Sequence, residues 1–315
     1  MKNIAKEYTY KIENELMDVY KLGPKLLVEP INHVFSGRGK RIRPLLTLFT
    51  SKTLGYNIDE ALDAAISIEI LHNFTLVHDD IMDKDKLRHG KETVNTKWDN
   101  DIALLAGDAM LALALKKLNT YSKNYLLFPT FTNGLLAVCE GQALDKEFEN
   151  KSNIDISEYL NMIDLKTGYL IGLAAELGSI ITEVDNEKTI LLRNFGRKIG
   201  RAFQIQDDVL EIFSDTKTMG KSLKSDLLLG KKTFLMVKGE NYNPGFIQEA
   251  KDMISKDYSS GITKIRDILI NNHIYEEANY LIKSSLEDAN QILSNLEYDT
   301  EYLKYFSNLI QNRKF

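Results

Sequence analysis

The sequence is poor in residues that interrupt helices and in residues that cross-link small folds. Its 315 residues include one cysteine, five prolines and 18 glycines. A single cysteine excludes an intrachain disulfide and a multi-cysteine zinc site. Cys139 itself is expected to be a small buried side chain on a helix rather than a nucleophile. The hydrophobic content of 43% excludes a disordered or collagen-like chain and predicts a large core.

The sequence also lacks a large excess of charge and a long apolar run. Its 40 basic and 45 acidic residues give a net charge of −5. This balance argues against a general nucleic-acid binder, but it allows a local basic pocket for an anionic substrate. The most apolar stretch, residues 102–115, is interrupted by Asp108 and is too short to span a bilayer. The first 16 residues contain no signal-peptide core, so a cytoplasmic location is expected.

Hydrophobic residues recur with helical spacing along almost the whole chain. No segment alternates with period two for long enough to predict a strand, and no composition shift marks a linker. We therefore expect an all-α fold, a single-domain bundle of many helices over residues 1–315. The expected helices span residues 3–20, 25–36, 42–54, 58–84, 99–121, 125–148, 155–181, 186–213, 232–240, 246–256, 260–272, 274–296 and 299–312.

One of the longest expected helices ends in an acidic cluster. His72, Leu76, Asp79 and Asp83 are spaced by four, three and four residues. This spacing aligns them on one stripe of an α-helix, with Asp80 about 100° round from Asp79. Carboxylates at a helix C-terminus oppose the helix dipole. Such a local conflict is typical of functional sites.

A second helix repeats this pattern at Gln204, Asp208, Glu211 and Asp215, with Asp207 directly before Asp208. One cluster alone could be a solvated helix end, but two favour a site for divalent cations. Mg²⁺ suits carboxylate ligands and completes its shell with water and substrate phosphates. If neighbouring helices are antiparallel, the two acidic helices, four steps apart, are parallel. Both acidic ends are then expected at the same rim of the bundle.

Basic residues next to glycines accompany the acidic clusters. Gly39, Lys40, Arg41 and Arg43 lie at the start of an expected helix. Free backbone N–H groups favour phosphate at such a helix start, and arginine suits diphosphate oxygens. Further basic residues lie between or after the clusters, namely Arg88, Lys166, Lys221 and Lys231. A basic loop is often only solvated, but in combination with the acidic clusters these residues indicate a metal-bridged diphosphate.

These residues lie in stretches by which the chain resembles the trans-isoprenyl diphosphate synthases, the polyprenyl synthetase family, over nearly its whole length. The matching stretches are GKRIRP at 39–44, LVHDDIMD at 76–83, RHG at 88–90, KTG at 166–168, FQIQDDVLE at 203–211, and GK at 220–221 and 230–231. The resemblance implies the all-α isoprenoid synthase fold, usually as a homodimer. It also implies condensation of isopentenyl diphosphate with an allylic diphosphate.

The resemblance further implies a role for each matching residue. Three Mg²⁺ ions on the allylic diphosphate would be held by Asp79, Asp83 and Asp207. Their shell would be completed or supported by Asp80, Asp208 and Glu211. The same diphosphate would be neutralised by Arg88, Lys166, Lys221 and Lys231. Isopentenyl diphosphate would be bound by Gly39, Lys40, Arg43 and His72. Dipoles for an allylic cation would come from Thr167 and Gln204.

Four positions depart from the family pattern. Glu211 stands where the family usually has aspartate, and His89 replaces the second arginine of the usual Arg-Arg-Gly. Arg38 and Lys224 each replace a common glycine. Phe74 lies five residues before Asp79, about 7.5 Å deeper along the helix, although its rotation of about 140° also allows packing between helices. An aromatic residue at this place in the family accompanies short products. We therefore expect a C15–C20 product.

Four alternatives are weighed against a short-chain synthase. A plain helical scaffold would not need Lys166 beside Thr167, or six carboxylates at one rim. A longer-chain polyprenyl diphosphate synthase would share every motif except the aromatic residue near the first cluster. A terpene cyclase would share the first cluster, but it usually carries an Asn/Ser/Glu metal motif in place of the second. A non-catalytic partner subunit typically loses one acidic motif, whereas this chain retains both.

Overall fold

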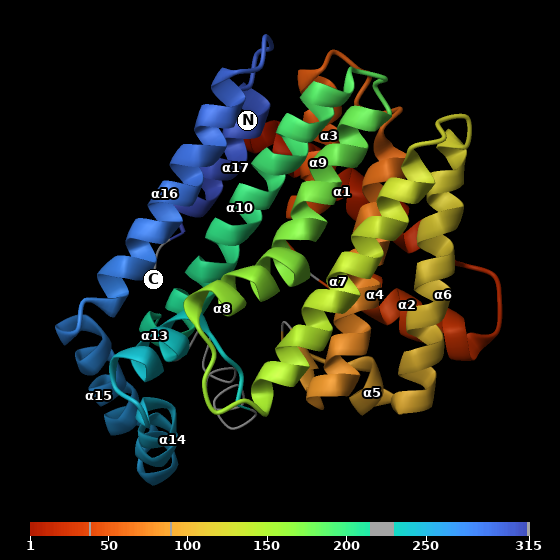
Figure 1. Cartoon of the computed structure of the whole chain (residues 1–315). Coiled ribbons are helices and arrows are strands. Elements are labelled where there is room, and N and C mark those ends of the chain that lie inside the picture. Colours follow the sequence, from red (N-terminus) through yellow and green to blue (C-terminus); the bar gives the residue numbers. More distant parts are fainter. Residues whose placement is uncertain (38, 89, 215–229, 314–315) are drawn as a thin grey trace. The chain divides into compact units, whose positions relative to one another are not determined.

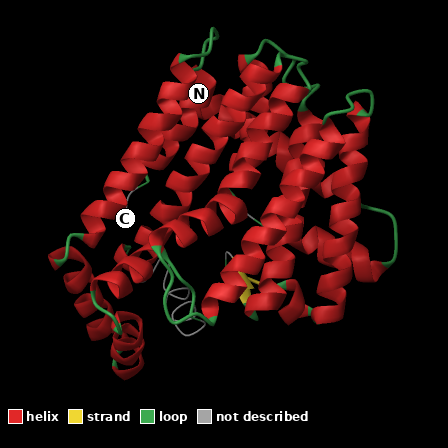
Figure 2. Ribbon diagram, viewed as in Figure 1, coloured by secondary structure: helices red, strands yellow, loops and turns green. Residues whose placement is uncertain are grey.

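A computed structural model describes residues 1–37, 39–88, 90–214 and 230–313. Over these residues the chain is almost entirely helical (Figure 2), which confirms the prediction of an all-α fold. Its described strands form one short antiparallel hairpin, β1 (Leu87–Arg88) and β2 (Lys91–Glu92). None of the helices described is both long and apolar enough to cross a membrane.

The described chain divides into two compact units, each assembled from separate stretches of the sequence. The first unit comprises Met1–Leu135, Leu173–Arg193 and Leu296–Tyr305. The second unit comprises Leu136–Gly172, Asn194–Asn295 and Phe306–Phe315. A single domain over residues 1–315 stays a prediction.

The first unit is built around a long central helix, α4 (Leu62–Asp83), which lies beside α6 (Asn100–Leu118) (Figure 1). The hydroxyl of Ser67 donates to the carbonyl of Ala114 at 2.8 Å and ties these two helices together in the core. The other elements of this unit are α1 (Lys2–Asp18), α2 (Lys25–Phe35), α3 (Ile42–Thr53), α5 (Val94–Lys97) and the 3₁₀ turn η1 (Asn119–Tyr121). The remainder comes from parts of α7 (Leu127–Glu149), α9 (Tyr169–Ile180), α10 (Asn186–Phe213) and α17 (Glu301–Gln311).

The second unit contains most of α10 together with α8 (Ile156–Ile163) and a π-helical turn, η2 (Asp164–Gly168). A Cβ on Gly200 would lie 2.6 Å from the Cα of Gly168, so a glycine is required where α10 crosses this turn. This unit also contains α13 (Phe234–Tyr242), α14 (Phe246–Lys256), α15 (Tyr258–Asn271) and α16 (Ile274–Ser294), together with the other parts of α7, α9 and α17. π-Helical turns are frequent at functional sites.

The observed helices follow the expected ones closely, with a few differences. The helix expected from residue 58 begins at Leu62, and α5 and the hairpin were not predicted. Strands of two residues are too short to show a period of two in the sequence. Cys139 is exposed on α7, so its expected burial is wrong.

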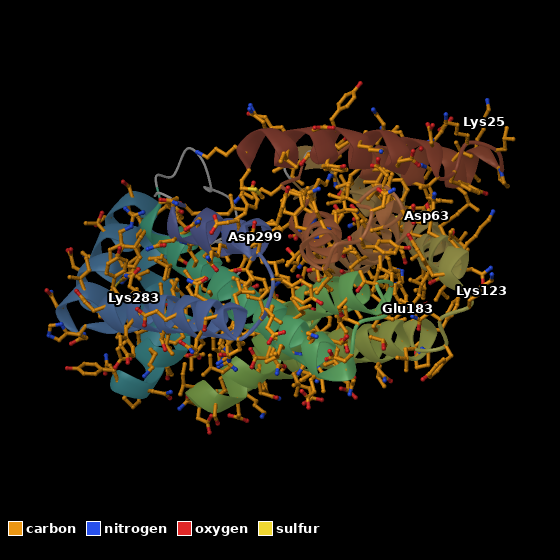
Figure 3. All side chains as sticks on the ribbon, turned by 90° about the horizontal axis from the view of Figure 1, so that it is seen from above. Lys25, Asp63, Lys123, Glu183, Lys283 and Asp299 are labelled. Carbon is orange, nitrogen blue, oxygen red and sulfur yellow. The ribbon has the colours of Figure 1, made fainter. Side chains whose placement is uncertain are left out.

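Charged side chains of both signs project from many of these helices and loops (Figure 3). Lys25 on α2, Glu183 after α9 and Lys283 on α16 are among the exposed ones. This surface agrees with the nearly balanced charge of the sequence.

Candidate functional site

The acidic end of α4 lies in the first unit. Asp80 and Asp83 are buried there, and Asp79 is partly exposed. The guanidinium of Arg88 donates to Oδ1 of Asp80 through Nε at 2.7 Å and through a terminal nitrogen at 2.6 Å. Burial raises the pKa of Asp80 to about 6, although the hydrogen bonds from Arg88 act to lower it. The hairpin that carries Arg88 therefore places a cation directly on this acidic cluster.

The basic residues at the start of α3 have different surroundings. Arg41 has a left-handed backbone with a φ of 49°, and its buried side chain donates to the carboxylate of Glu69 at 2.7 Å. Lys40, by contrast, is exposed, and a guanidinium nitrogen of Arg43 lies 3.1 Å from Nε2 of His72. The structure thus brings together two residues predicted to bind isopentenyl diphosphate, and it assigns Arg41 to anchoring the loop.

Phe74 lies on α4 before the acidic cluster. It is 7% exposed, and its ring centroid is 4.6 Å from that of His78. A Cβ on Gly107 of α6 would lie 2.2 Å from Nε2 of His78, so α6 needs a glycine where this imidazole packs. Phe74, His78 and Gly107 thus form a continuous contact across the α4–α6 interface.

Lys166 lies in the π-helical turn of the second unit, and its ammonium group contacts Oδ2 of Asp145 at 2.6 Å. Asp145 is buried on α7. A Cβ on Gly141 would lie 2.3 Å from the backbone nitrogen of Lys166, so α7 approaches the turn closely here. Asp145 thereby fixes the direction of a lysine that the sequence predicts to neutralise diphosphate.

A hydrogen-bond network joins this turn to the acidic end of α10. Thr167 donates to Oε1 of Gln204 at 2.9 Å, and Nε2 of Gln204 donates to Oδ1 of Asp208 at 3.0 Å. Oδ2 of Asp208 accepts from the hydroxyl of Tyr159 at 2.6 Å and from the backbone N–H of Phe234 at 2.7 Å. Burial raises the pKa of Asp208 to about 6, while these three donors act to lower it.

The other carboxylates of α10 have different surroundings. Arg313, near the chain's C-terminus, donates to Oδ1 of Asp207 at 2.5 Å, and Glu211 is partly exposed. Arg266 of α15 donates to the carbonyls of Ile212 and Ser214 at 2.6 and 2.7 Å. A basic side chain that binds the last carbonyls stabilises a helix C-terminus, here the one that carries the acidic cluster.

Lys231 and Lys221 are the two remaining basic residues that the sequence predicts to neutralise diphosphate. Lys231 is partly exposed, three residues before the start of α13. Lys221 lies outside the described residues. Lys231 therefore lies in the segment that leads into Phe234, whose backbone N–H donates to Asp208.

Sequence reasoning missed four residues that hold the predicted ones in place: Asp145, Tyr159, Arg266 and Arg313. Asp145 could have been found from the sequence, because Val138, Gly141 and Asp145 are spaced by three and four residues. It therefore lies on the same buried face of α7. A carboxylate at such a position requires a partner. Tyr159 looks like an ordinary core aromatic, and no local pattern distinguishes it.

The acidic residues have the donor chemistry that Mg²⁺ prefers. Asp79 and Asp83 are one helical turn apart on α4 and present carboxylate oxygens, and Asp207 does so on α10. In the described part of the chain, no group of three His, Cys, Asp or Glu side chains could enclose a metal ion. Mg²⁺ does not need such a cage, because it keeps several waters and takes up substrate phosphates. The donors at each of the two acidic helix ends therefore fit Mg²⁺.

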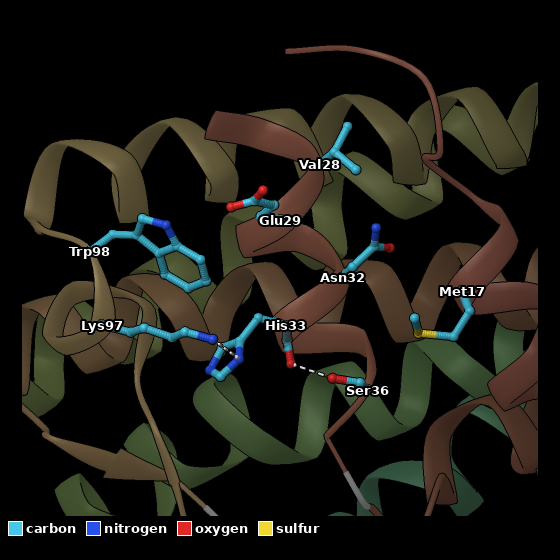
Figure 4. A pocket seen from close by; sticks show the side chains of 8 residues that line it. All are labelled: Met17, Val28, Glu29, Asn32, His33, Ser36, Lys97 and Trp98. Atoms are coloured by element: carbon cyan, nitrogen blue, oxygen red, sulfur yellow. Dashed lines mark hydrogen bonds between the residues drawn. The ribbon is translucent and has the colours of Figure 1, made fainter. Parts of the chain in front are cut away.

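A cavity of about 580 Å³ lies elsewhere in the first unit (Figure 4). Nε2 of His33 donates to the carbonyl of Glu92 at 2.7 Å, so its Nδ1 is left to accept from Lys97 at 3.4 Å. The cavity is lined by Met17, Val28, Glu29, Asn32, His33, Ser36, Lys97 and Trp98. It includes no residue that the sequence predicts to bind metal or diphosphate.

Comparison with known proteins gives consistent results. The family model described as polyprenyl synthetase matches residues 24–269. The geranylgeranyl diphosphate synthase of Saccharolobus solfataricus is 36% identical over 97% of this chain and 87% of its own length. The geranylfarnesyl diphosphate synthase of Aeropyrum pernix is 34% identical over 90% of this chain and 92% of its own. The crystal structure of a geranylgeranyl pyrophosphate synthetase from Pyrococcus horikoshii superposes with a TM-score of 0.91. It is 33% identical and covers 99% of this chain and 98% of that one.

Proposed function

The chain belongs to the polyprenyl synthetase family, and we propose that it condenses isopentenyl diphosphate with an allylic diphosphate to give a short-chain trans-prenyl diphosphate. One observation carries this proposal. Residues from three stretches far apart in the sequence form one hydrogen-bond network, which consists of Thr167, Gln204, Asp208 and Phe234. Phe234 is three residues after Lys231. These stretches are those that the resemblance assigns to the diphosphate and the allylic cation.

The mechanism requires charge to move onto a leaving diphosphate. Lys166 and Lys231 would stabilise that charge, and Asp145 holds the ammonium group of Lys166 in one direction. As the allylic C–O bond breaks, the hydroxyl of Thr167 and the amide of Gln204 would direct their dipoles at the cation. The double bond of isopentenyl diphosphate then attacks the cation. The released diphosphate is the base that we propose for the final proton.

The family uses Mg²⁺, and we propose that three ions bind with the substrate. When bound, they supply Lewis-acid stabilisation of the leaving group. Asp79, Asp83 and Asp207 would be the ligands. Because Asp208 already accepts three hydrogen bonds inside the protein, we propose that it supports the site rather than ligating metal. Asp80, held by two donors of Arg88, is proposed to act in the same way.

The proposed reaction is tested by measuring released diphosphate with dimethylallyl diphosphate and isopentenyl diphosphate, with and without Mg²⁺. We expect release that requires the metal and both substrates, together with a prenyl product. Release from geranyl, farnesyl or geranylgeranyl diphosphate alone, with a cyclic or alcohol product, would instead identify a cyclase. An absence of release under every condition would contradict the proposed activity.

The predicted site for isopentenyl diphosphate leads to a kinetic prediction. Lys40→Ala and Arg43→Ala are expected to raise the KM for isopentenyl diphosphate about tenfold, because each removes a charge-assisted contact to phosphate. The KM for the allylic substrate should change much less. Lys25→Ala, at an exposed position on α2, is the control and should leave both values unchanged. Steady-state kinetics that show equal effects on the two substrates would contradict separate phosphate sites.

We further propose a homodimer. Leu104 and Leu105, adjacent on α6, are 50% and 54% exposed, and contiguous exposed leucines favour burial against a partner. Replacing both by Asp should shift the protein from a dimer toward a monomer while the helix content is retained. Light scattering after size-exclusion chromatography measures this shift. A mass that stays dimeric in the variant would place the interface elsewhere.

The product length is the finer part of the proposal. The relatives are named as geranylgeranyl and geranylfarnesyl diphosphate synthases, which supports a short chain. We propose C15–C20, with C20 favoured, and the geranylfarnesyl relative makes the next longer product the first alternative. A cytoplasmic location stays a prediction.

A further inference from the structure

Tyr159 of α8 lies in none of the stretches that carry the family resemblance, yet it contacts one of the acidic residues directly. Its side chain is 1% exposed, and its hydroxyl donates to Oδ2 of Asp208 at 2.6 Å. The ring also packs edge-to-face on Phe234, with centroids 5.9 Å apart. Tyr159 therefore fixes both the carboxylate of Asp208 and the residue at which α13 begins.

Asp208 passes this constraint on to Gln204. An ionised carboxylate only accepts hydrogen bonds, so the NH₂ group of Gln204 must face Asp208, at 3.0 Å. The amide oxygen of Gln204 then faces the other way, where it accepts from Thr167 at 2.9 Å. The orientation of the Gln204 dipole thus depends on where the carboxylate of Asp208 is held.

Asp208 also holds the start of α13. Its Oδ2 accepts from the backbone N–H of Phe234, the first residue of that helix. A carboxylate at a helix N-terminus satisfies an otherwise unpaired N–H and interacts favourably with the dipole. Because Lys231 is only three residues earlier, the same contact restrains the segment that carries this lysine.

We propose that Tyr159 is a positioning residue for the condensation: through Asp208 it orients the amide of Gln204 and restrains the segment that carries Lys231. This inference rests on the proposed function, since it gives Gln204 and Lys231 the roles stated there. Without the hydroxyl, Oδ2 of Asp208 keeps the backbone N–H of Phe234 but loses the donor from Tyr159, and the carboxylate can rotate away from Gln204.

Tyr159→Phe tests the inference, because it removes only the hydroxyl and keeps the ring. We expect kcat to fall about tenfold, in line with the loss of one hydrogen bond to a charged group. The KM of each substrate should change by less than about threefold, because the effect falls on the transition state. Tyr121→Phe is the matched control. It removes a phenol hydroxyl that donates to the carbonyl of Glu60 in the first unit, so it should lower the Tm but leave kcat unchanged.

A double-mutant cycle separates positioning from a merely structural role. If Tyr159 acts through Asp208, then Tyr159→Phe in an Asp208→Asn background should lower kcat no further than Asp208→Asn alone. A full additional tenfold loss would overturn the proposal. If Tyr159→Phe does not fold, Asp208→Asn tests the same network, and a wild-type kcat in that variant would overturn it.

The outcomes also separate this inference from the proposed function. A wild-type protein that does not condense the two diphosphates overturns both. An active wild type, together with a Tyr159→Phe variant that keeps the wild-type kcat, overturns only the role of Tyr159.

Discussion

Asp79→Ala is expected to lower kcat for condensation by about a thousandfold or more, while the helix content and the Tm stay close to those of the wild type. The activity is lost because Asp79 is a proposed ligand of the ions that stabilise the leaving diphosphate. The fold is retained because Asp79, Asp80 and Asp83 crowd negative charge at the C-terminus of α4, against the helix dipole. Removal of one charge in the absence of metal relieves repulsion.

The measurement combines diphosphate release with circular dichroism on the metal-free variant. Asp267→Ala, at an exposed position on α15, is the control for loss of a helical carboxylate and should keep its activity. Marked unfolding of the Asp79 variant would indicate a structural role for this carboxylate. Activity within tenfold of the wild type would contradict its role as a ligand.

Asp207→Ala should lose a similar amount of activity and also some stability. In the structure Asp207 accepts from Arg313 at 2.5 Å, and the guanidinium of Arg313 also lies 4.6 Å from the ring of Phe203. Removing the carboxylate leaves this mostly buried cation without that partner, which costs free energy of folding. The motif around Asp207 does not show this contact with Arg313.

The sequence predicts the helices well because helical periodicity is a local property. The expected helix over residues 186–213 has the same ends as α10, and the expected 25–36 differs from α2 by one residue. The long apolar stripes of these helices extend over many turns, so single exceptions do not obscure them. The acidic clusters are equally local, since spacings of three and four residues fix a shared stripe.

Contacts between distant residues decide what the sequence could not predict. Arg41 lies in the same basic segment as Lys40 and Arg43. Its left-handed backbone turns its side chain inward, where it contacts Glu69, 28 positions further along the chain. Gly200 of α10 and Gly141 of α7 closely approach the π-helical turn at Gly168 and Lys166. No local pattern encodes these approaches, because they arise when three helices pack.

The sequence predicts the motif residues of the site, but it does not predict the residues that support them. The motif residues were identified individually, and the structure brings together Arg43 with His72 and Thr167 with Gln204. Their supporting partners were not identified, because a buried tyrosine such as Tyr159 differs from other core aromatics only by the atom that its hydroxyl contacts. Sequence patterns identify residues that act on substrates more readily than residues that position them.

The ring of Phe74 is expected to determine the length of the prenyl product. Phe74 lies five residues before Asp79, about 7.5 Å deeper along α4, and its ring packs against His78, which in turn lies against Gly107 of α6. A growing prenyl chain that extends below the metal site along α4 would meet this contact. We propose that Phe74 forms the floor that ends elongation.

Phe74→Ala is therefore expected to lengthen the main product by at least one isoprene unit, because the truncation opens space where the ring packs. Phe49→Ala is the matched control. Phe49 is fully buried on α3 against Tyr302 and Tyr305, so this change should cost a similar free energy of unfolding, about 3–5 kcal/mol, and leave the product unchanged. Both variants are assayed below their unfolding transitions, and the dephosphorylated products are separated by chain length. An unchanged distribution in Phe74→Ala, or long chains from the wild type, would show that Phe74 packs between helices without limiting the product.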